Sequence, residues 1–166
     1  MERLIYRKTA FLLFTSLASA SSLAAGQNSA NFNVTIVIQA NCTIAANNLT
    51  FPPQGVLSSA VTATSALTVT CTNTTPYFVG LSAGSGTGNT ETNRRMFGAV
   101  NTSAFVAYQL YKSDQSVWGD IASPNTRQGG TGNGAAQTLT VNGTVPAQAT
   151  PAPDTYSSTV TATVYF

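Results

Sequence analysis

The chain has 166 residues, a net charge of +2 and no histidine, and only 7% of its residues are charged. A soluble domain usually has about 25%. Nucleic-acid binding is excluded because it needs a basic face toward the phosphates. A Ser-His-Asp triad, a Cys-His pair and an imidazole metal site are excluded because each needs histidine. The scattered acids also disfavour paired-carboxylate catalysis, so we expect a protein that is not an enzyme and uses no cofactor.

The positive charge belongs to the N-terminus. The first eight residues hold three basic residues and one acidic residue. The charged residues after them are Arg94, Arg95, Lys112 and Arg127 against Glu91, Asp114, Asp120 and Asp154. The chain beyond its first eight residues is therefore neutral.

The N-terminus has the order of a secretory signal peptide. Basic residues precede an apolar run at residues 10–14, and small residues follow. The apolar stretch is too short for the ~30 Å of hydrocarbon that a transmembrane anchor must cross. We predict cleavage after Ala24, with Ala20 and Ala25 as alternatives, and leave residues 1–24 out of the fold. The mature protein is expected to be exported.

Two cysteines, Cys42 and Cys71, are the only ones in the chain. An even number in an exported chain predicts a disulfide, because compartments outside the cytoplasm are oxidising. A metal site or a redox pair fits less well, since two thiols without histidine bind zinc poorly and the spacing matches no redox motif. A disulfide that closes a loop of about 30 residues stabilises a fold by roughly 3.5 kcal/mol.

Short runs of alternating apolar and polar residues recur after the signal peptide. The first places Phe32, Val34, Ile36 and Ile38 on one face. The later runs lie at residues 67–72, 77–81, 105–111, 139–145 and 155–166. Segments rich in Gly, Pro and Asn separate the runs, and no segment has a sustained helical period. The pattern predicts an all-β sandwich or barrel.

The two ends of the mature chain are unusual. The last run continues to Phe166 without a closing turn, and a sandwich that ends in this way can leave that strand without a neighbour. Proteins normally suppress an unpaired edge. A free strand at residues 32–38 could fill the groove beside such an edge in another copy by β-strand addition. Alternatively, residues 32–38 form the first strand of their own sandwich.

A series of short motifs has a specific order and spacing, although each is weak alone. The motifs are Asn41-Cys42-Thr43-Ile44, Leu67-Thr68-Val69-Thr70-Cys71-Thr72, Thr75-Pro76-Tyr77, Leu81-Ser82-Ala83-Gly84, Arg95-Met96, Val106-Ala107-Tyr108-Gln109-Leu110-Tyr111, Val117-Trp118-Gly119-Asp120 and Tyr156-Ser157-Ser158-Thr159-Val160-Thr161-Ala162-Thr163-Val164-Tyr165-Phe166. With the alternating N-terminal strand, they resemble the spore-coat-U-like domain family of archaic chaperone–usher pilus subunits. The resemblance covers nearly all of the mature chain. Asp154 and Ser158 depart from it, because the family usually has Gly and often has Asp at these positions.

The resemblance implies an incomplete immunoglobulin-like β-sandwich that lacks its last strand and carries an N-terminal donor strand. A periplasmic chaperone would lend a strand, and at the outer-membrane usher the extension of the next subunit would replace it. Repeated exchange would build a surface pilus, or fimbria, that supports attachment and biofilm formation. The implied divisions are the signal peptide at 1–24, the donor extension at 25–38 and the pilin sandwich at 39–166.

The resemblance also implies roles for single residues. The side chains that would plug the groove of a neighbouring subunit are Phe32, Val34, Ile36 and Ile38. The residues of the last strand that would line the acceptor groove or contact the chaperone are Val160, Ala162, Val164 and Phe166. Cys42 and Cys71 would join the first two strands.

A different class of function also fits the composition. The chain could be a self-contained secreted surface or coat protein, a lectin-like β-sandwich in which Trp118 stacks on a sugar. A lone tryptophan more often packs within a sandwich.

Other candidate sites are weak. Asp114 and Asp120 supply too few ligands for calcium, so no metal is expected. The Gly-rich segments 84–88 and 129–134 are predicted to be hairpin loops, because neither has the Lys-Ser/Thr end of a phosphate-binding loop. The pair Arg94-Arg95 is predicted to lie at a solvated loop tip.

Overall fold

The computed structural model describes residues 26–121 and 125–166. The predicted signal peptide lies outside the described residues. The chain divides into two units, Met1–Ile36 and Val37–Phe166, and all assigned strands fall in the second. The described residues form no helix, and therefore none that could cross a membrane.

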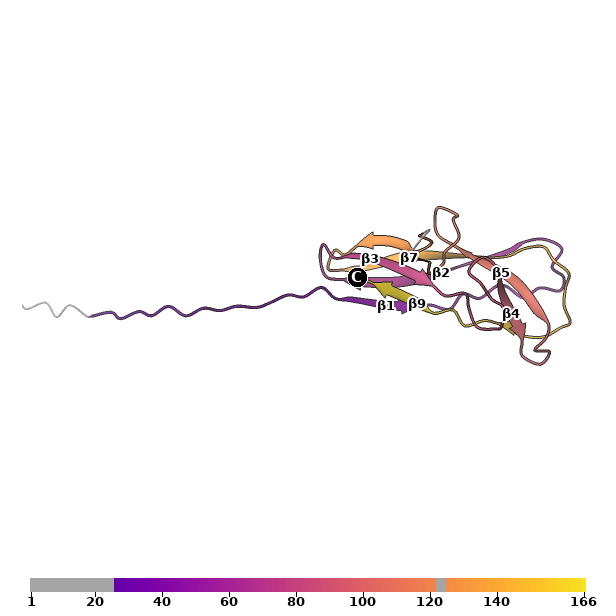
Figure 1. Ribbon diagram of the computed structural model, residues 1–166, viewed down its shortest axis with the longest axis horizontal. Helices are drawn as coiled ribbons and strands as arrows, with labels where there is room; N and C mark the ends of the chain where they lie inside the picture. Colours follow the sequence, from indigo (N-terminus) through magenta and orange to yellow (C-terminus); the bar gives the residue numbers. More distant parts are fainter. Residues whose placement is uncertain (1–25, 122–124) are drawn as a thin grey trace, which may run out of the picture. The chain divides into compact units, whose positions relative to one another are not determined.

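Two antiparallel sheets make up the second unit (Figure 1). The strands are β1 (Cys42–Ala46), β2 (Val61–Cys71), β3 (Pro76–Leu81), β4 (Arg94–Gly98), β5 (Phe105–Tyr111), β6 (Gln128–Thr131), β7 (Ala136–Val145), β8 (Tyr156–Ser157) and β9 (Ala162–Tyr165). The first sheet has the order β1-β2-β7-β5-β4-β8, and the second has the order β6-β3-β9. The fold is therefore the all-β sandwich that the sequence predicts.

The core lies between the sheets. Along β2, Leu67, Val69 and Cys71 are buried, whereas the threonines between them are partly exposed. This is the alternation expected of a strand with one face toward the core. Val69 packs in the same cluster as Val79 of β3, and neither residue is exposed.

The disulfide forms as expected between Cys42 and Cys71. The two residues are direct partners in the antiparallel pairing of β1 with β2. Since β1 is at the edge of its sheet, the disulfide fixes an edge strand that has only one neighbouring strand.

The C-terminal run differs from its prediction as one continuous strand. β8 pairs with β4 in the first sheet, and β9 pairs with β3 in the second. Residues 158–161 cross between the sheets, and the backbone N–H groups of Ser82 and Ser85 donate to the carbonyls of Thr161 and Thr159 at 2.9 Å. The alternating pattern persists through the crossing, so periodicity alone does not reveal the break.

One glycine-rich segment is a strand instead of a loop. Gly129 and Gly130 belong to β6, where Gly130 is paired with Tyr77. A side chain at Gly130 would collide with the Tyr77 ring. Glycine is required here because the ring lies directly over the backbone.

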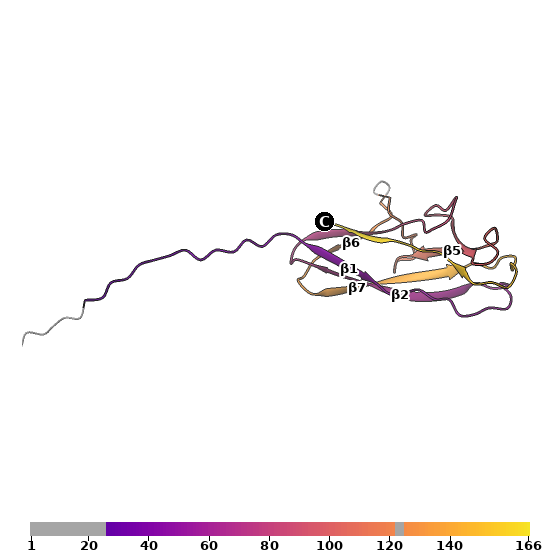
Figure 2. The same cartoon turned by 90° about the horizontal axis from the view of Figure 1, so that it is seen from below.

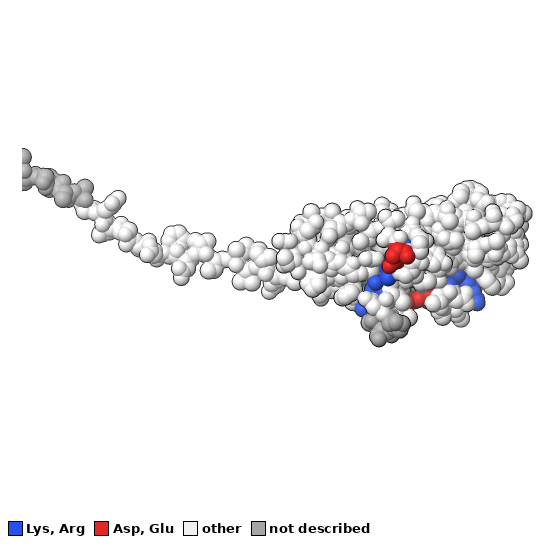
Figure 3. Space-filling view, turned by 90° about the horizontal axis from the view of Figure 1, so that it is seen from above, with Lys and Arg blue, Asp and Glu red and all other residues white. Residues whose placement is uncertain are grey.

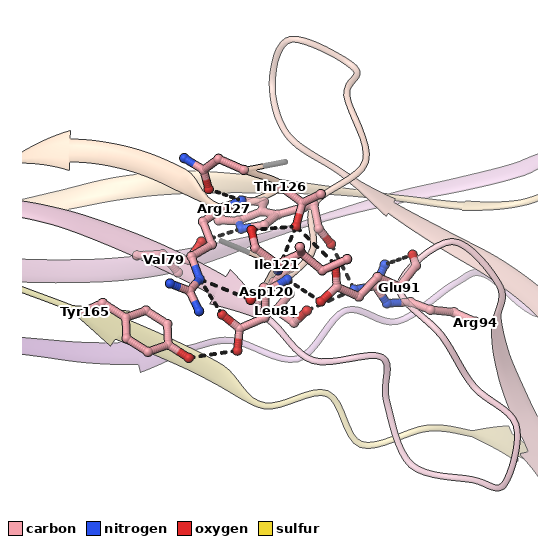
Figure 4. Close-up of polar contacts among 11 residues, drawn as sticks. Val79, Leu81, Glu91, Arg94, Asp120, Ile121, Thr126, Arg127 and Tyr165 are labelled. Carbon is pink, nitrogen blue, oxygen red and sulfur yellow. Dashed lines mark hydrogen bonds and ion pairs between the residues drawn. The ribbon is translucent and has the colours of Figure 1, made fainter. Parts of the chain in front are cut away.

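Arg94 corrects the prediction of a solvated loop tip, because its side chain is fully buried at the start of β4 (Figure 4). The guanidinium donates to the carbonyls of Leu81 (3.1 Å), Ser82 (2.9 Å), Glu91 (2.7 Å) and Trp118 (2.8 Å) and to Oε1 of Gln109 (2.6 Å). Burial lowers the pKa of Arg94. The buried cation thus joins three loops to β5.

We predict that Arg94→Ala lowers the free energy of unfolding by roughly 3–5 kcal/mol, because it leaves several buried carbonyls without a donor. Urea unfolding of the mature chain measures the change. Arg95→Ala is the matched control. Arg95 lies 4.6 Å above the Phe105 ring, and losing that contact should cost no more than about 1 kcal/mol. Equal losses in the two variants would contradict the role given to Arg94.

Candidate functional site: an open apolar groove

The sandwich is open along one side, between the segment that follows β1 and the segment that precedes β9. The two strands lie side by side and run in opposite directions (Figures 1 and 2). Among the described strands, β1 pairs only with β2, and β9 pairs only with β3. Each therefore presents one row of backbone N–H and C=O groups that no strand satisfies.

Two hollows extend along this open side. The first, of about 400 Å³, lies between residues 46–51 and 158–162, and core residues such as Leu67 and Leu110 line it. The second, of about 420 Å³, lies between residues 51–57 and 150–156. Its apolar lining includes Leu57, Val61, Met96, Val106 and Val145. Phe51 and Met96 line both hollows, so we treat them as sections of one open groove.

The predicted groove residues are placed as follows. Val160 and Ala162 line the first hollow. Val164 packs against the core but lines neither hollow. Phe166 is 60% exposed.

Sequence reasoning missed the opposite wall of the groove. Leu49 and Phe51 line it from the connection between β1 and β2. They stand in a Pro-rich segment without alternation, which reads as a plain loop. Two large apolar side chains so close to Pro52-Pro53 are unusual in an exposed loop, and they could have indicated that this segment packs against the core.

One polar atom in the groove lining has no partner. The hydroxyl of Tyr108 is buried and makes no hydrogen bond within the described residues, and Tyr108 lines the first hollow. A buried unpaired hydroxyl costs roughly 1–3 kcal/mol. Its presence is consistent with a core that is incomplete at this side.

The segment before β1 carries exposed apolar side chains, whereas the groove lacks a cover. Residues 26–41 form neither helix nor strand. Phe32, Val34 and Ile36 are 83–84% exposed, and Val37 and Ile38 are 81% and 71% exposed. The interpretation that residues 32–38 form the first strand of their own sandwich is therefore wrong. A row of exposed apolar side chains normally marks a surface that binds something.

A small polar cluster fixes the outer side of β9 (Figure 4). Asp120 accepts from Nε of Arg127 at 2.7 Å and from the hydroxyl of Tyr165 at 2.9 Å. The guanidinium of Arg127 lies 3.8 Å above the Tyr165 ring. The hydrogen bond to Asp120 is the main cause of a raised pKa for Tyr165. The cluster holds β9 in place without using its free backbone edge.

The two acids considered for calcium have separate partners. Asp114 accepts from Ser116, whereas Asp120 is paired with Arg127. Within the part of the chain that the structure describes, no three His, Cys, Asp or Glu side chains form a metal-binding group.

Charged side chains gather in one area of the face shown in Figure 3, and the rest of that face is uncharged.

Trp118 is not a surface aromatic. Its side chain is 1% exposed, and its Nε1 donates to the carbonyl of Val79 at 2.8 Å. A sugar could not stack on this ring without opening the core. The lectin-like alternative therefore loses the residue on which it rested.

Fold and groove together define an all-β sandwich with one open side. The chain matches the model of the Spore Coat Protein U domain over residues 28–163 and belongs to that family. The family resemblance seen in the sequence is thereby confirmed. No curated protein matches the chain.

Solved structures show a similar fold. One is the crystal structure of the CsuC–CsuE chaperone–tip adhesion subunit pre-assembly complex from archaic chaperone–usher Csu pili of Acinetobacter baumannii. The TM-score is 0.57 at 24% identity, over 78% of this chain and 40% of that chain. A chaperone–tip adhesin complex of CFA/I fimbriae biogenesis has a TM-score of 0.41 at 12% identity, over 75% and 41% of the chains, and carries no weight. This chain thus spans about two fifths of the matched chains.

Asp154, which departs from the family pattern, borders the second hollow. Its carboxylate accepts from the backbone N–H groups of Asn101 and Val100 at 2.9 Å and of Thr155 at 2.7 Å. These hydrogen bonds lower the pKa of Asp154, and the one from the Asn101 backbone has the largest effect. The carboxylate therefore ties the start of β8 to the loop after β4.

We predict that Asp154 makes stability depend on acid pH. Its pKa is lower in the folded chain than in the unfolded chain, so its stabilisation is present at neutral pH and is lost as the pH falls below about 4. The urea midpoint of the wild type should fall between about pH 5 and pH 2.5, and Asp154→Asn should fall less steeply. Asp114, whose pKa is lowered mainly by the Ser116 hydroxyl, contributes in the same way, so the double Asn variant should be flatter still. Equal slopes for wild type and Asp154→Asn would refute this.

Proposed function

We propose that this chain is a structural subunit of a surface pilus, polymerised by donor-strand exchange through the chaperone–usher pathway. Residues 25–38 of one copy would form the donor strand that completes the sandwich, residues 39–166, of the next. One observation carries the proposal. The same chain holds an exposed alternating apolar segment and an open apolar groove flanked by an unpaired strand edge.

The side chains of the segment fit the groove in chemistry and spacing. A strand rises about 3.3 Å per residue, so alternate plugs are spaced about 6.6 Å apart on one face. The plugs Phe32, Val34, Ile36 and Ile38 would face the core, and Asn33 and Thr35 would face solvent. Each fully buried apolar side chain contributes about 1.5–3 kcal/mol. Four plugs therefore outweigh the cost of ordering a short segment only if most of them are buried.

The backbone supports the same arrangement. A strand laid beside β9 would satisfy its free row of N–H and C=O groups, as in β-strand addition. Val160 and Ala162 line the hollow in which the incoming side chains would pack. Affinity would come from the backbone hydrogen bonds, and register from the alternating plugs.

The groove needs a cover before another subunit arrives, because an exposed apolar edge promotes aggregation. A periplasmic chaperone that lends a strand and holds the C-terminal end at Phe166 would provide it. The solved complex of a chaperone with a pilus subunit, to which this fold is similar, supports this partner. The usher of the outer membrane would then exchange the chaperone strand for the donor of the next copy.

The signal at residues 1–24 would send the chain through the periplasm to the cell surface. There the pilus would serve surface attachment and biofilm formation. We propose a structural and not a catalytic role. The nearly uncharged mature chain suits this role, because neutral subunits repel each other little along a fibre.

We predict that Ile36→Asp abolishes polymers, because it would place a carboxylate in an apolar groove, where an unpaired charge is very unfavourable. Thr35→Asp is the matched control, since its side chain would face solvent, and it should polymerise like the wild type. The measurement is a denaturing gel of heated and unheated surface extracts, in which strand-exchanged polymers give a heat-labile ladder.

Deletion of residues 25–38 should likewise leave a chain that binds the chaperone but enters no polymer. If the shortened chain still assembles into chaperone-free fibres, the donor segment has been assigned wrongly.

A further inference from the structure

The link between the predicted donor segment and β1 is held at the end of β2. The backbone N–H of Asn41 donates to Oγ1 of Thr72 at 3.1 Å, and the backbone N–H of Thr72 donates to the Asn41 carbonyl at 2.9 Å. The Thr72 hydroxyl also lies 3.3 Å from the carbonyl oxygens of Gln39 and Asn41. The disulfide between Cys42 and Cys71 closes the same end of the sheet. We call the contacts of Thr72 with Gln39 and Asn41 the exit clamp.

The exit clamp keeps the link in line with β1. The β1–β2 ladder ends at the disulfide pair, and beyond it one backbone hydrogen bond joins Thr72 to Asn41. The Thr72 hydroxyl reaches two residues further back, to Gln39. A chain held at both residues cannot turn back at this point without losing the contacts.

Chain length limits how the donor segment could enter the groove of its own molecule. The groove begins beside Ala46, about 13 Å along β1 from Cys42. Fully stretched, the four steps from Ile38 to Cys42 span about 14 Å. If the segment ran in the same direction as β1, no plug before Ile38 could reach the groove.

The donor segment could also reach the groove of its own molecule by forming a hairpin with β1, with the chain reversing at residues 39–41. It would place Ile38 beside Cys42, Val34 beside Ala46 and Phe32 beside Asn48. Two plugs would then reach the first hollow, and none would reach the second, which begins at Phe51. The reversal also breaks the exit clamp. A segment from another copy has neither limit.

We infer that Thr72 is a positioning residue, which hinders the donor segment from closing on its own chain and directs it to a second copy. The inference rests on the proposed function. On this view the Thr72 hydroxyl partly determines whether the chain forms closed monomers or polymers.

The test is a competition during refolding. The mature full-length chain, refolded under oxidising conditions over a range of concentrations, partitions between closed monomer and polymer. Closure within a chain does not depend on concentration, whereas exchange between copies does. Unheated denaturing gels give the crossover concentration, at which half of the chain is polymer. A long flexible Gly-Ser insert between Gln39 and Ala40 marks where closed monomer migrates.

Thr72→Val removes the hydroxyl and should raise the crossover concentration about five- to tenfold, the effect of losing one or two modest hydrogen bonds. Thr70→Val is the matched control, because Thr70 is two residues before Thr72 and pairs with Thr43 in the ladder, where it accepts the Thr43 hydroxyl at its backbone carbonyl and not at its side chain. It should match the wild type, as should Thr72→Ser, which keeps the hydroxyl.

A Thr72→Val crossover equal to that of Thr70→Val, with a wild type that polymerises, would overturn the exit clamp and leave the proposed function intact. A wild type that forms no polymer at any concentration would overturn both. The exit clamp is tested by the ratio of the crossover concentrations of two variants, whereas the proposed function is tested by polymer formation in the wild type. Failure of one can therefore be told from failure of the other.

Discussion

The fold depends on a sandwich that its own chain does not close. β1 and β9 end their sheets and lie side by side, and the open groove begins beside the end of β1 and the start of β9, yet no hydrogen bond joins the two strands within the described residues. Buried backbone groups are almost always paired in folded proteins, and apolar core surface is normally covered. An open side violates both tendencies at once. A strand from another copy would satisfy both, and this is the role proposed for the exposed segment at residues 32–38.

The few charged residues of the two sheets and their loops stabilise the open sandwich. Arg94 donates to buried carbonyls, Asp120 joins Arg127 to Tyr165, and Asp154 caps backbone N–H groups beside the second hollow. Of these residues Arg94 is buried, whereas Asp120, Arg127 and Asp154 are half-buried and hydrogen-bonded, so the low charge first seen as an exclusion of enzymes has a structural meaning.

Much of the fold could be predicted from the sequence, because half-buried strands leave a period-2 pattern, as in β2, and paired cysteines in an exported chain indicate a disulfide. Other features left no such pattern. Arg94 and Arg95 look alike in the sequence, yet both lie in β4 and not at a loop tip, Arg94 buried and Arg95 half-buried over the Phe105 ring. The alternation across residues 155–166 conceals a crossing between sheets. The wall formed by Leu49 and Phe51 depends on tertiary packing, which local propensity does not encode.

Amide hydrogen exchange in assembled fibres tests the central claim most directly. If residues 32–38 become a strand in the groove of the next copy, their backbone N–H groups should exchange as slowly as those of β2 in the fibre and rapidly in the isolated chain. The free edge of β9 should gain protection at the same time. Fibres in which residues 32–38 exchange as fast as an unstructured peptide would contradict donor-strand assembly.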